Sequence, residues 1–164
     1  MNWFTTMNAQ LSRWVMYLAC VCLAGLLSVV VYGVVLRYVF NDAPAYVEQV
    51  ALLLVVSVAM FGASAGVRDA GHIGLDSLVK VLPRAVQFWC KFLVFVLTII
   101  FAIALIAGGV EMAVSTHHDT IPTLGISESV RYVPVLIAGV LITLFSIEHM
   151  LAQFTGKEVH SSWH

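Results

Sequence analysis

Charged residues are scarce in this 164-residue chain: Asp, Glu, Lys and Arg make up 10% of it, against about 25% in soluble domains, while hydrophobic residues make up 61%. The chain also lacks an excess of positive charge, since eight basic residues stand against nine acidic ones, and this excludes a nucleic-acid-binding surface. Three cysteines cannot all pair with one another, and Cys20 and Cys22 lie within one apolar run, which argues against a disulfide-stapled secreted fold. We therefore interpret the chain as an integral membrane protein.

Long polar stretches are equally rare, because four apolar runs occupy most of the sequence. A helix needs about 20 mostly apolar residues to cross roughly 30 Å of hydrocarbon, and backbone groups in lipid have to be satisfied within the segment itself. The runs show no strand-like alternation, so each is predicted to be a transmembrane α-helix. The chain is expected to be all-α, a single four-helix membrane domain over residues 1–164. The predicted spans cover residues 15–36, 48–67, 92–111 and 131–149.

The distribution of Lys and Arg predicts the orientation of these spans. Six of the eight basic residues lie in the N-terminal segment, the middle loop and the C-terminal tail, and two lie in the first and third loops. Because cytoplasmic segments carry the excess of Lys and Arg, both termini are expected in the cytoplasm.

Two segments outside the spans have the pattern of amphipathic helices at the membrane surface. In the middle loop, apolar residues recur at i, i+3, i+4 and i+7, while basic and polar residues fall on another face. This pattern predicts an interfacial helix over about residues 75–90, broken near Pro83. The N-terminal segment repeats apolar residues at helical spacing from Trp3 to Trp14. Both segments are interpreted as anchors at the lipid surface, with a partner-binding site as the alternative.

The apolar runs lack ionisable side chains away from their ends, which is the feature most informative about mechanism. Ion and proton pathways place such side chains within spans, and transport sites break helices with Pro or Gly at mid-membrane. Neither feature is present, so the chain is not expected to transport anything alone. No nucleophile–base arrangement, metal-ligand spacing or phosphate loop is found either. We therefore predict no enzymatic activity, no catalytic residue, no metal and no cofactor.

One small-residue motif stands out in the second run. Gly62 and Gly66 are four positions apart with Ala63, Ser64 and Ala65 between them, a spacing that permits the close approach of another helix. The motif serves either a contact with a partner or packing within the chain, and the sequence leaves both open.

Two other classes of function have to be considered, one that depends on histidine ligands and one that depends on a membrane-buried acid. His72 and His149 lie near the predicted cytoplasmic boundary, and His117 and His118 lie near the outer one. A bis-histidine haem at one face, as in the membrane anchor subunit of a respiratory complex, is therefore an alternative. A small multidrug exporter is the second alternative, but it needs a membrane-buried acid, and the one candidate, Glu48, lies at a span edge.

The residues at the edges of the spans form an ordered set. It consists of Leu36-Arg37-Tyr38-Val39-Phe40 with Pro44 and Glu48; Gly66-Val67-Arg68 with His72, Ile73 and Asp76; and Ile121-Pro122, Leu124-Gly125-Ile126-Ser127-Glu128, Tyr132 and Pro134. This set, with the length and topology, resembles the small four-helix membrane subunit of tripartite ATP-independent periplasmic (TRAP) transporters, the DctQ-like family. The likeness covers roughly residues 37–148, and the first helix matches in hydropathy alone.

The resemblance implies a secondary transporter of three parts in the inner membrane of a bacterium. A periplasmic binding protein captures an organic acid, and a large multi-helix subunit carries it together with sodium ions. The small subunit binds the large one and widens the static scaffold against which transport takes place. For this chain the resemblance therefore implies a stable complex with the large TRAP membrane subunit, a transient contact with the binding protein, and contact with lipids.

Six residues are candidates for structural or partner-interface roles in that setting. Arg37 and Glu48 flank the short first loop, eleven positions apart, and they either pair or anchor their helix ends independently in the headgroups. The family commonly shows two acids at the start of the second helix, where this chain has Glu48 and Gln49. The six candidates are Arg37, Glu48, Gly62, Gly66, Arg68 and His72.

Overall fold

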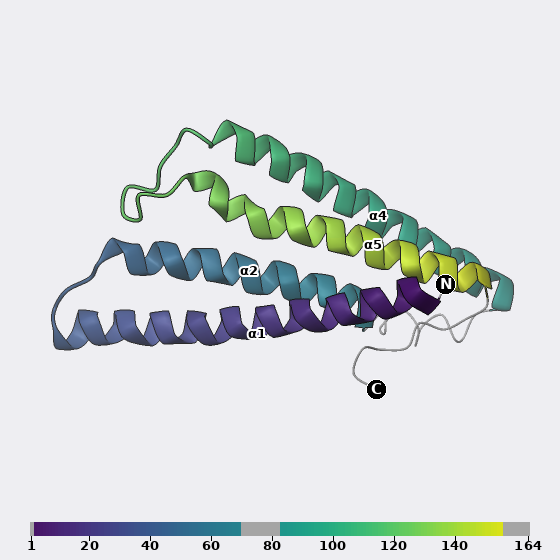
Figure 1. The fold of residues 1–164 in the computed structure, drawn as a ribbon, viewed down its shortest axis with the longest axis horizontal. Coiled ribbons are helices and arrows are strands. Elements are labelled where there is room, and N and C mark those ends of the chain that lie inside the picture. The colour runs from purple at the N-terminus through teal and green to yellow at the C-terminus, as the bar shows by residue number, and fades with distance from the viewer. Residues whose placement is uncertain (1, 70–82, 156–164) are drawn as a thin grey trace.

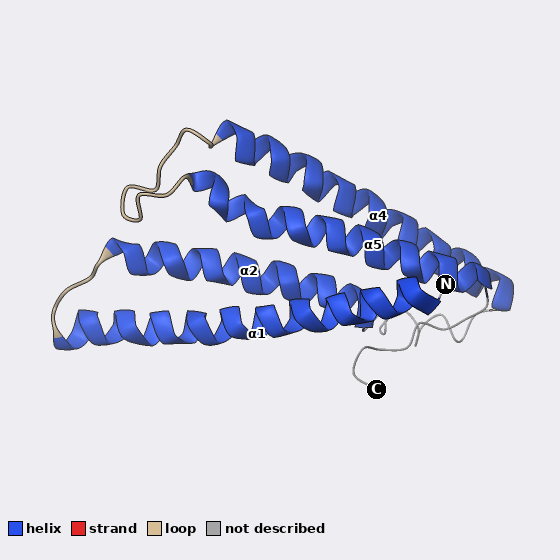
Figure 2. Cartoon of the chain, in the orientation of Figure 1, coloured by secondary structure: helices blue, strands red, loops and turns tan. Residues whose placement is uncertain are grey.

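Four long helices make up nearly all of the described structure. The structure, a computed structural model, describes residues 2–69 and 83–155. Its elements are α1 (Asn2–Val39), α2 (Ala45–Asp69), α4 (Arg84–Ser115), the short 3-10 helix η1 (Glu128–Tyr132) and α5 (Val133–Thr155), as Figures 1 and 2 show. The prediction of an all-helical chain with four helices long and apolar enough to cross a membrane is confirmed.

Two of the helices extend well beyond the apolar runs. α1 continues without a break from Asn2 to Val39, so the N-terminal segment and the first apolar run form one helix. α4 starts directly after Pro83, so residues 84–90 form its first turns, whereas residues 75–82 of the predicted interfacial helix lie outside the described residues. At 1.5 Å per residue, the 38 residues of α1 span about 57 Å and the 32 residues of α4 about 48 Å. Both helices are longer than the hydrocarbon layer is thick.

The helices lie side by side in the order α1, α2, α5, α4, which Figure 1 shows from bottom to top. α2 packs against α1 on one side and α5 on the other, α5 packs in turn against α4, and α1 touches α5 at a few positions. Among the described residues α1 and α4 have no extensive contact with each other. The arrangement is therefore a slab with α1 and α4 at its edges, and not a closed four-helix bundle.

The core of the slab lies where α1, α2 and α5 meet. Each of these helices contributes two residues one turn apart: Val15 and Ala19, Phe61 and Ala65, and Leu141 and Phe145. Most other large apolar side chains, especially on α1 and α4, face outward. Such exposure is expected of helices in lipid, because lipid tails are as apolar as these side chains and do not drive them inward.

The two ends of the slab differ in which helix ends and loops they contain. We call the end where α1 begins and α2 and α5 finish the N-terminal end, and the end with the loops 40–44 and 116–127 the loop end (Figure 1). The longer loop is ordered by backbone hydrogen bonds of 2.9 Å from Ile121 N to Ile126 O and from Glu128 N to Asp119 O. Gly125 supports this turn with φ of 66°, a left-handed value that glycine adopts without steric cost.

Candidate functional site

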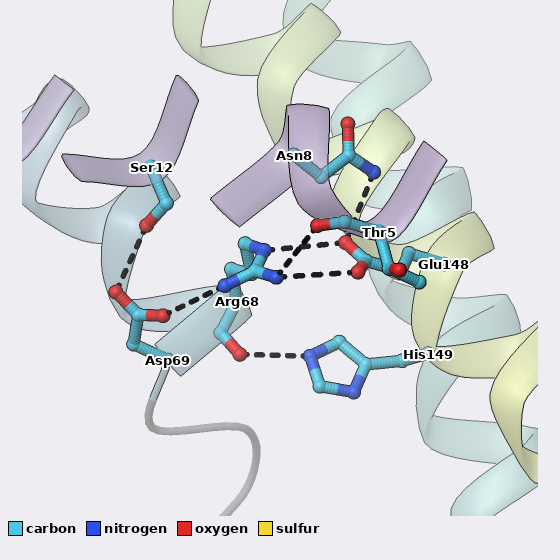
Figure 3. Close-up of polar contacts among 7 residues, drawn as sticks. All are labelled: Thr5, Asn8, Ser12, Arg68, Asp69, Glu148 and His149. Atoms are coloured by element: carbon cyan, nitrogen blue, oxygen red, sulfur yellow. Dashed lines mark hydrogen bonds and ion pairs between the residues drawn. The ribbon is translucent and has the colours of Figure 1, made fainter. Parts of the chain in front are cut away.

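A buried ion pair joins α2 to α5 at the N-terminal end of the slab. Arg68, one residue before the end of α2, directs Nε to Oε2 of Glu148 on α5 at 3.2 Å, and Nη2 to Oε1 at 3.3 Å (Figure 3). The two side chains are 2% and 1% exposed. This two-point contact fixes both the spacing and the relative rotation of the helices, because a guanidinium and a carboxylate match in one plane.

The start of α1 covers this pair and adds polar contacts of its own. Asn8 donates from Nδ2 to Glu148 Oε2 at 2.9 Å, and the carbonyl of Thr5 accepts from Arg68 Nη2 at 3.4 Å. Ser12 donates from Oγ to Asp69 Oδ2 at 2.9 Å, and Asp69 also pairs with Arg68 Nη1 at 3.1 Å. Three helices distant in sequence therefore meet in one hydrogen-bonded group, whose members all lie close together in Figure 3.

His149 adds a link between α5 and the last turn of α2. Its Nε2 lies 2.9 Å from the carbonyl oxygen of Arg68, and because a carbonyl only accepts, this contact assigns the proton to Nε2. The imidazole also stacks on Phe95 of α4, with ring centroids 5.5 Å apart and planes 10° apart. His149 thus satisfies one of the carbonyls that every helix leaves unpaired in its last turn. We call Asn8, Ser12, Arg68, Asp69, Glu148 and His149 the buried polar cluster.

The burial of these charges determines what the cluster can do. An ion taken out of water loses several kcal/mol of hydration, and the partner restores it only when geometry and further hydrogen bonds are good. All three side-chain nitrogens of Arg68 and both carboxylate oxygens of Glu148 take part in hydrogen bonds, so each charge is already compensated within the protein. Within residues 2–69 and 83–155 no group of three or more His, Cys, Asp and Glu is placed to hold a metal ion. The arrangement suits holding helices together and does not suit acid–base chemistry.

Part of the buried polar cluster has a visible signal in the sequence. Arg68 and Glu148 end the second and the fourth apolar runs, and in a chain of four antiparallel spans those two ends lie on the same side of the membrane. Opposite charges there are natural partners, and Arg68 was singled out while Glu148 was not. Asn8 and Ser12 were missed because they lie in a segment whose pattern indicated a surface anchor.

The loop end carries ion pairs of a different kind. Arg37 Nη2 lies 3.3 Å from Glu48 Oε1, so the structure brings these two predicted site residues together, with side chains 58% and 71% exposed. Arg131, in η1, donates from Nη2 to Gln49 Oε1 at 2.9 Å and pairs through Nη1 with Glu128 at 3.1 Å. Gln49 of α2 therefore has a basic partner in η1, although it is an amide at a position where the family commonly has an acid.

The glycines divide into two groups by what lies in front of them. A Cβ built on Gly33, Gly109 or Gly139 comes within 2.6 to 2.8 Å of a side chain of a neighbouring helix, so these glycines allow helices of the chain to approach closely. A Cβ built on Gly62 or Gly66 meets nothing within 4 Å. The two predicted site glycines are therefore not used for packing among the described residues.

The histidines do not gather at one place. His149 lies at the N-terminal end, His117 and His118 lie in the loop at the other end with ring centroids 5.4 Å apart, and His72 lies outside the described residues. The described histidines at opposite ends are too far apart to share a haem, and Nε2 of His149 is already engaged with the carbonyl of Arg68.

Comparison with known proteins gives a consistent picture. The family described as "Tripartite ATP-independent periplasmic transporters, DctQ component" matches residues 26–156. Two Haemophilus influenzae proteins, each named as a TRAP transporter small permease protein, are similar to this chain. One is 26% identical over 134 residues, covering 81% of this chain and 83% of that protein. The other is 27% identical over 150 residues, covering 88% of this chain and 89% of that protein.

A third relative has a different length. The sialic acid TRAP transporter permease protein SiaT of another Haemophilus influenzae strain is 28% identical over 149 residues, which cover 82% of this chain and 23% of that protein. In SiaT, a segment similar to this chain is therefore part of a much longer permease.

Proposed function

Because this chain belongs to the DctQ component family of TRAP transporters, we propose that it is the small permease subunit that scaffolds a large membrane subunit during sodium-coupled uptake of an organic acid. A periplasmic binding protein delivers the acid, and both termini of this chain lie in the cytoplasm of a bacterium whose inner membrane holds the complex. The observation that carries the proposal is the slab. It is built of four apolar helices that keep charge at their ends and leave broad apolar surfaces uncovered.

The absence of charge inside the slab supports a scaffold role and argues against ion coupling by this chain alone. Within the apolar parts of α1, α2, α4 and α5 there is no Asp, Glu, Lys, Arg or His between the charges at the two ends. Coupled transport needs polar groups at mid-membrane to bind the ion or proton. Those groups are therefore supplied by the partner subunit.

The unequal burial of the helices supports a partner in the membrane. In the apolar stretch of α5 39% of the residues are buried inside the chain, against 6% in that of α1. A slab of this kind has much more apolar surface than a closed bundle, and that surface is available to lipid or to other helices. SiaT supports the large partner, since there a similar segment and a longer permease are one chain.

The open face of α2 is the surface that we assign to the large subunit. In the C-terminal third of α2, small residues replace large ones along this face, and no atom of the described residues lies where a Cβ of Gly62 or Gly66 would stand. The adjoining face, about a third of a turn away, carries Phe61, Ala65 and Arg68 and is held by α1 and α5. Small residues allow two backbones to approach closely in lipid, where van der Waals contact drives association. A transmembrane helix of the large subunit is the occupant we propose.

Substitution of these glycines tests the interface directly. Gly62→Leu with Gly66→Leu is expected to abolish co-purification with the large subunit while the small subunit alone unfolds as the wild type does, since the new side chains enter open space. Gly108→Leu is the matched control: it is also open, but it lies on α4 at the edge of the slab. Unchanged association of the double variant would show that α2 is not the contact.

Reconstitution tests the division of labour. In liposomes under a sodium gradient, this chain alone is expected to give no uptake of the organic acid, and uptake is expected only with the large subunit and the binding protein present. Uptake by this chain alone at the rate of the full complex would refute the scaffold role.

A further inference from the structure

Four aromatic rings form a closed cluster at the N-terminal end, where α4 begins and α5 finishes. Phe88 contacts Trp89 at 6.3 Å and Phe154 at 5.8 Å between ring centroids, and Phe92 contacts the same two rings at 6.2 Å and 6.0 Å. All four contacts are edge-to-face, the arrangement that favours aromatic pairs. We call these four residues the aromatic cluster.

The aromatic cluster is not part of the core. The side of the chain that it occupies is open: Trp89 is 67% exposed and Phe154 is 60% exposed. We propose that the aromatic cluster is a docking surface for the headgroup region of the bilayer, and that its partner is an anionic phospholipid surface. This proposal does not depend on the contact that we assign to α2.

The length of α4 places the aromatic cluster at the edge of the hydrocarbon. A helix of 32 residues, about 48 Å, would need a tilt of about 50° to fit inside a 30 Å layer, beyond the observed range of about 0–40°. At least one end of α4 therefore leaves the hydrocarbon, and the basic residues Arg84 and Lys91 mark the first turns as such an end. Its N-cap residue, Pro83, makes no side-chain hydrogen bond to the first turn, so water or headgroups are natural partners for the N–H groups there. Phe88, Trp89 and Phe92 lie within the first three turns.

Chemistry and charge favour a lipid headgroup region over other occupants. Tryptophan is enriched at the membrane surface because its ring is apolar and its N–H is polar. The described residues hold three tryptophans, and the two outside the aromatic cluster, Trp3 and Trp14, lie in the first four turns of α1. Lys91 follows Trp89 by two positions, and Arg84 begins α4, so two basic residues share the first turns of this helix with the aromatic cluster. A positive surface beside interfacial aromatics complements anionic phospholipid.

Quenching of tryptophan fluorescence measures the position of this surface. We suggest a chain with Trp3→Phe, Trp14→Phe and Trp163→Phe, which leaves Trp89, assembled with the large subunit in vesicles that contain phospholipids brominated either near the headgroup or near the chain end. Trp89 is expected to be quenched most by shallow bromines. A chain with Phe101→Trp and no other tryptophan is the depth control, because Phe101 is exposed in the middle of α4 and is expected to be quenched most by deep bromines.

The charge of the partner is tested in the same vesicles. Brominated phosphatidylglycerol is expected to quench Trp89 more than brominated phosphatidylcholine at equal mole fraction, because the anionic lipid would be enriched up to about fivefold around Trp89. Lys91→Gln is expected to reduce the difference in quenching between the two lipids. Equal quenching by the two lipids would overturn the anionic partner. Deepest quenching by deep bromines would overturn the headgroup location. Quenching in the chain alone that is lost in the complex would show that the large subunit covers the aromatic cluster and would overturn the proposal.

Discussion

The two ends of the slab both contain arginine–carboxylate contacts across helices, but they differ in what surrounds them. At the N-terminal end, Arg68 and Glu148 are 2% and 1% exposed and are covered by the first turns of α1. At the loop end, Arg37 and Glu48 are 58% and 71% exposed at nearly the same separation. An exposed pair contributes about 0–1 kcal/mol, whereas removal of one partner from a buried pair costs about 3–5 kcal/mol. Distance alone therefore says little about what a contact contributes, and burial decides it.

The largest effect is expected for Glu148→Ala. This change leaves the Arg68 guanidinium buried without its carboxylate, and we expect a loss of about 3–5 kcal/mol in the free energy of unfolding, measured in detergent micelles by thermal or SDS denaturation. The control is Arg68→Met combined with Glu148→Leu, which removes both charges and is expected to recover most of the loss. If the single variant were as stable as the wild type, the pair would not hold the slab together.

A smaller effect is expected where α1 covers the pair. Asn8→Ala removes the hydrogen bond to Glu148, and Ser12→Ala removes the bond to Asp69; each is expected to cost about 1–3 kcal/mol because a buried acceptor loses its donor. Leu11→Ala, at an exposed neighbouring position of the same helix, is the control and is expected to change stability little. Hydrogen exchange of the first turns of α1 provides a second readout. Equal losses for all three variants would show that the two hydrogen bonds contribute no more than an exposed side-chain contact.

Gln49→Glu is expected to strengthen the contact between α2 and η1 at the loop end. The new carboxylate would face Arg131, which is 29% exposed at its side chain, so we expect a gain of up to about 1 kcal/mol that decreases with added salt. Gln49→Ala is the comparison and should lower stability. A loss with Glu in place of Gln would show that repulsion from Glu48 and Glu128 outweighs the new pair.

The smallest effect is expected for the exposed pair. Arg37→Ala and Glu48→Ala should each change the stability of the isolated chain by about 0–1 kcal/mol, with a coupling that falls in high salt. The same double-mutant cycle on co-purification with the large subunit tests whether the complex buries the pair. Strong coupling and recovery on swapping the charges would support a pair, whereas additive losses without recovery would support independent anchors.

The fold was predictable to the extent that it depends on hydrophobicity along the chain. The four apolar runs are long enough that lipid leaves the backbone no alternative to a helix, and all four helices are present. The lengths of the helices were less predictable. The segment from Trp3 to Trp14 would show the same amphipathic pattern on the membrane surface and as the extension of a span. In the structure it is the first part of α1.

The candidate site was predictable only in part. The sequence alone identified a helical membrane chain, the ends of its charge-free spans, and Arg68, Gly62 and Gly66 as residues of interest, because each of these follows from residue type and spacing. Only the tertiary structure decided that Arg68 meets Glu148 beneath Asn8 and that Arg37 reaches Glu48. It also decided that Gly62 and Gly66 have no packing neighbour among the described residues. The physical reason is that hydropathy fixes which segments enter lipid, whereas in lipid the rotation and neighbours of each helix depend on packing and polar contacts between residues as far apart as 140 positions.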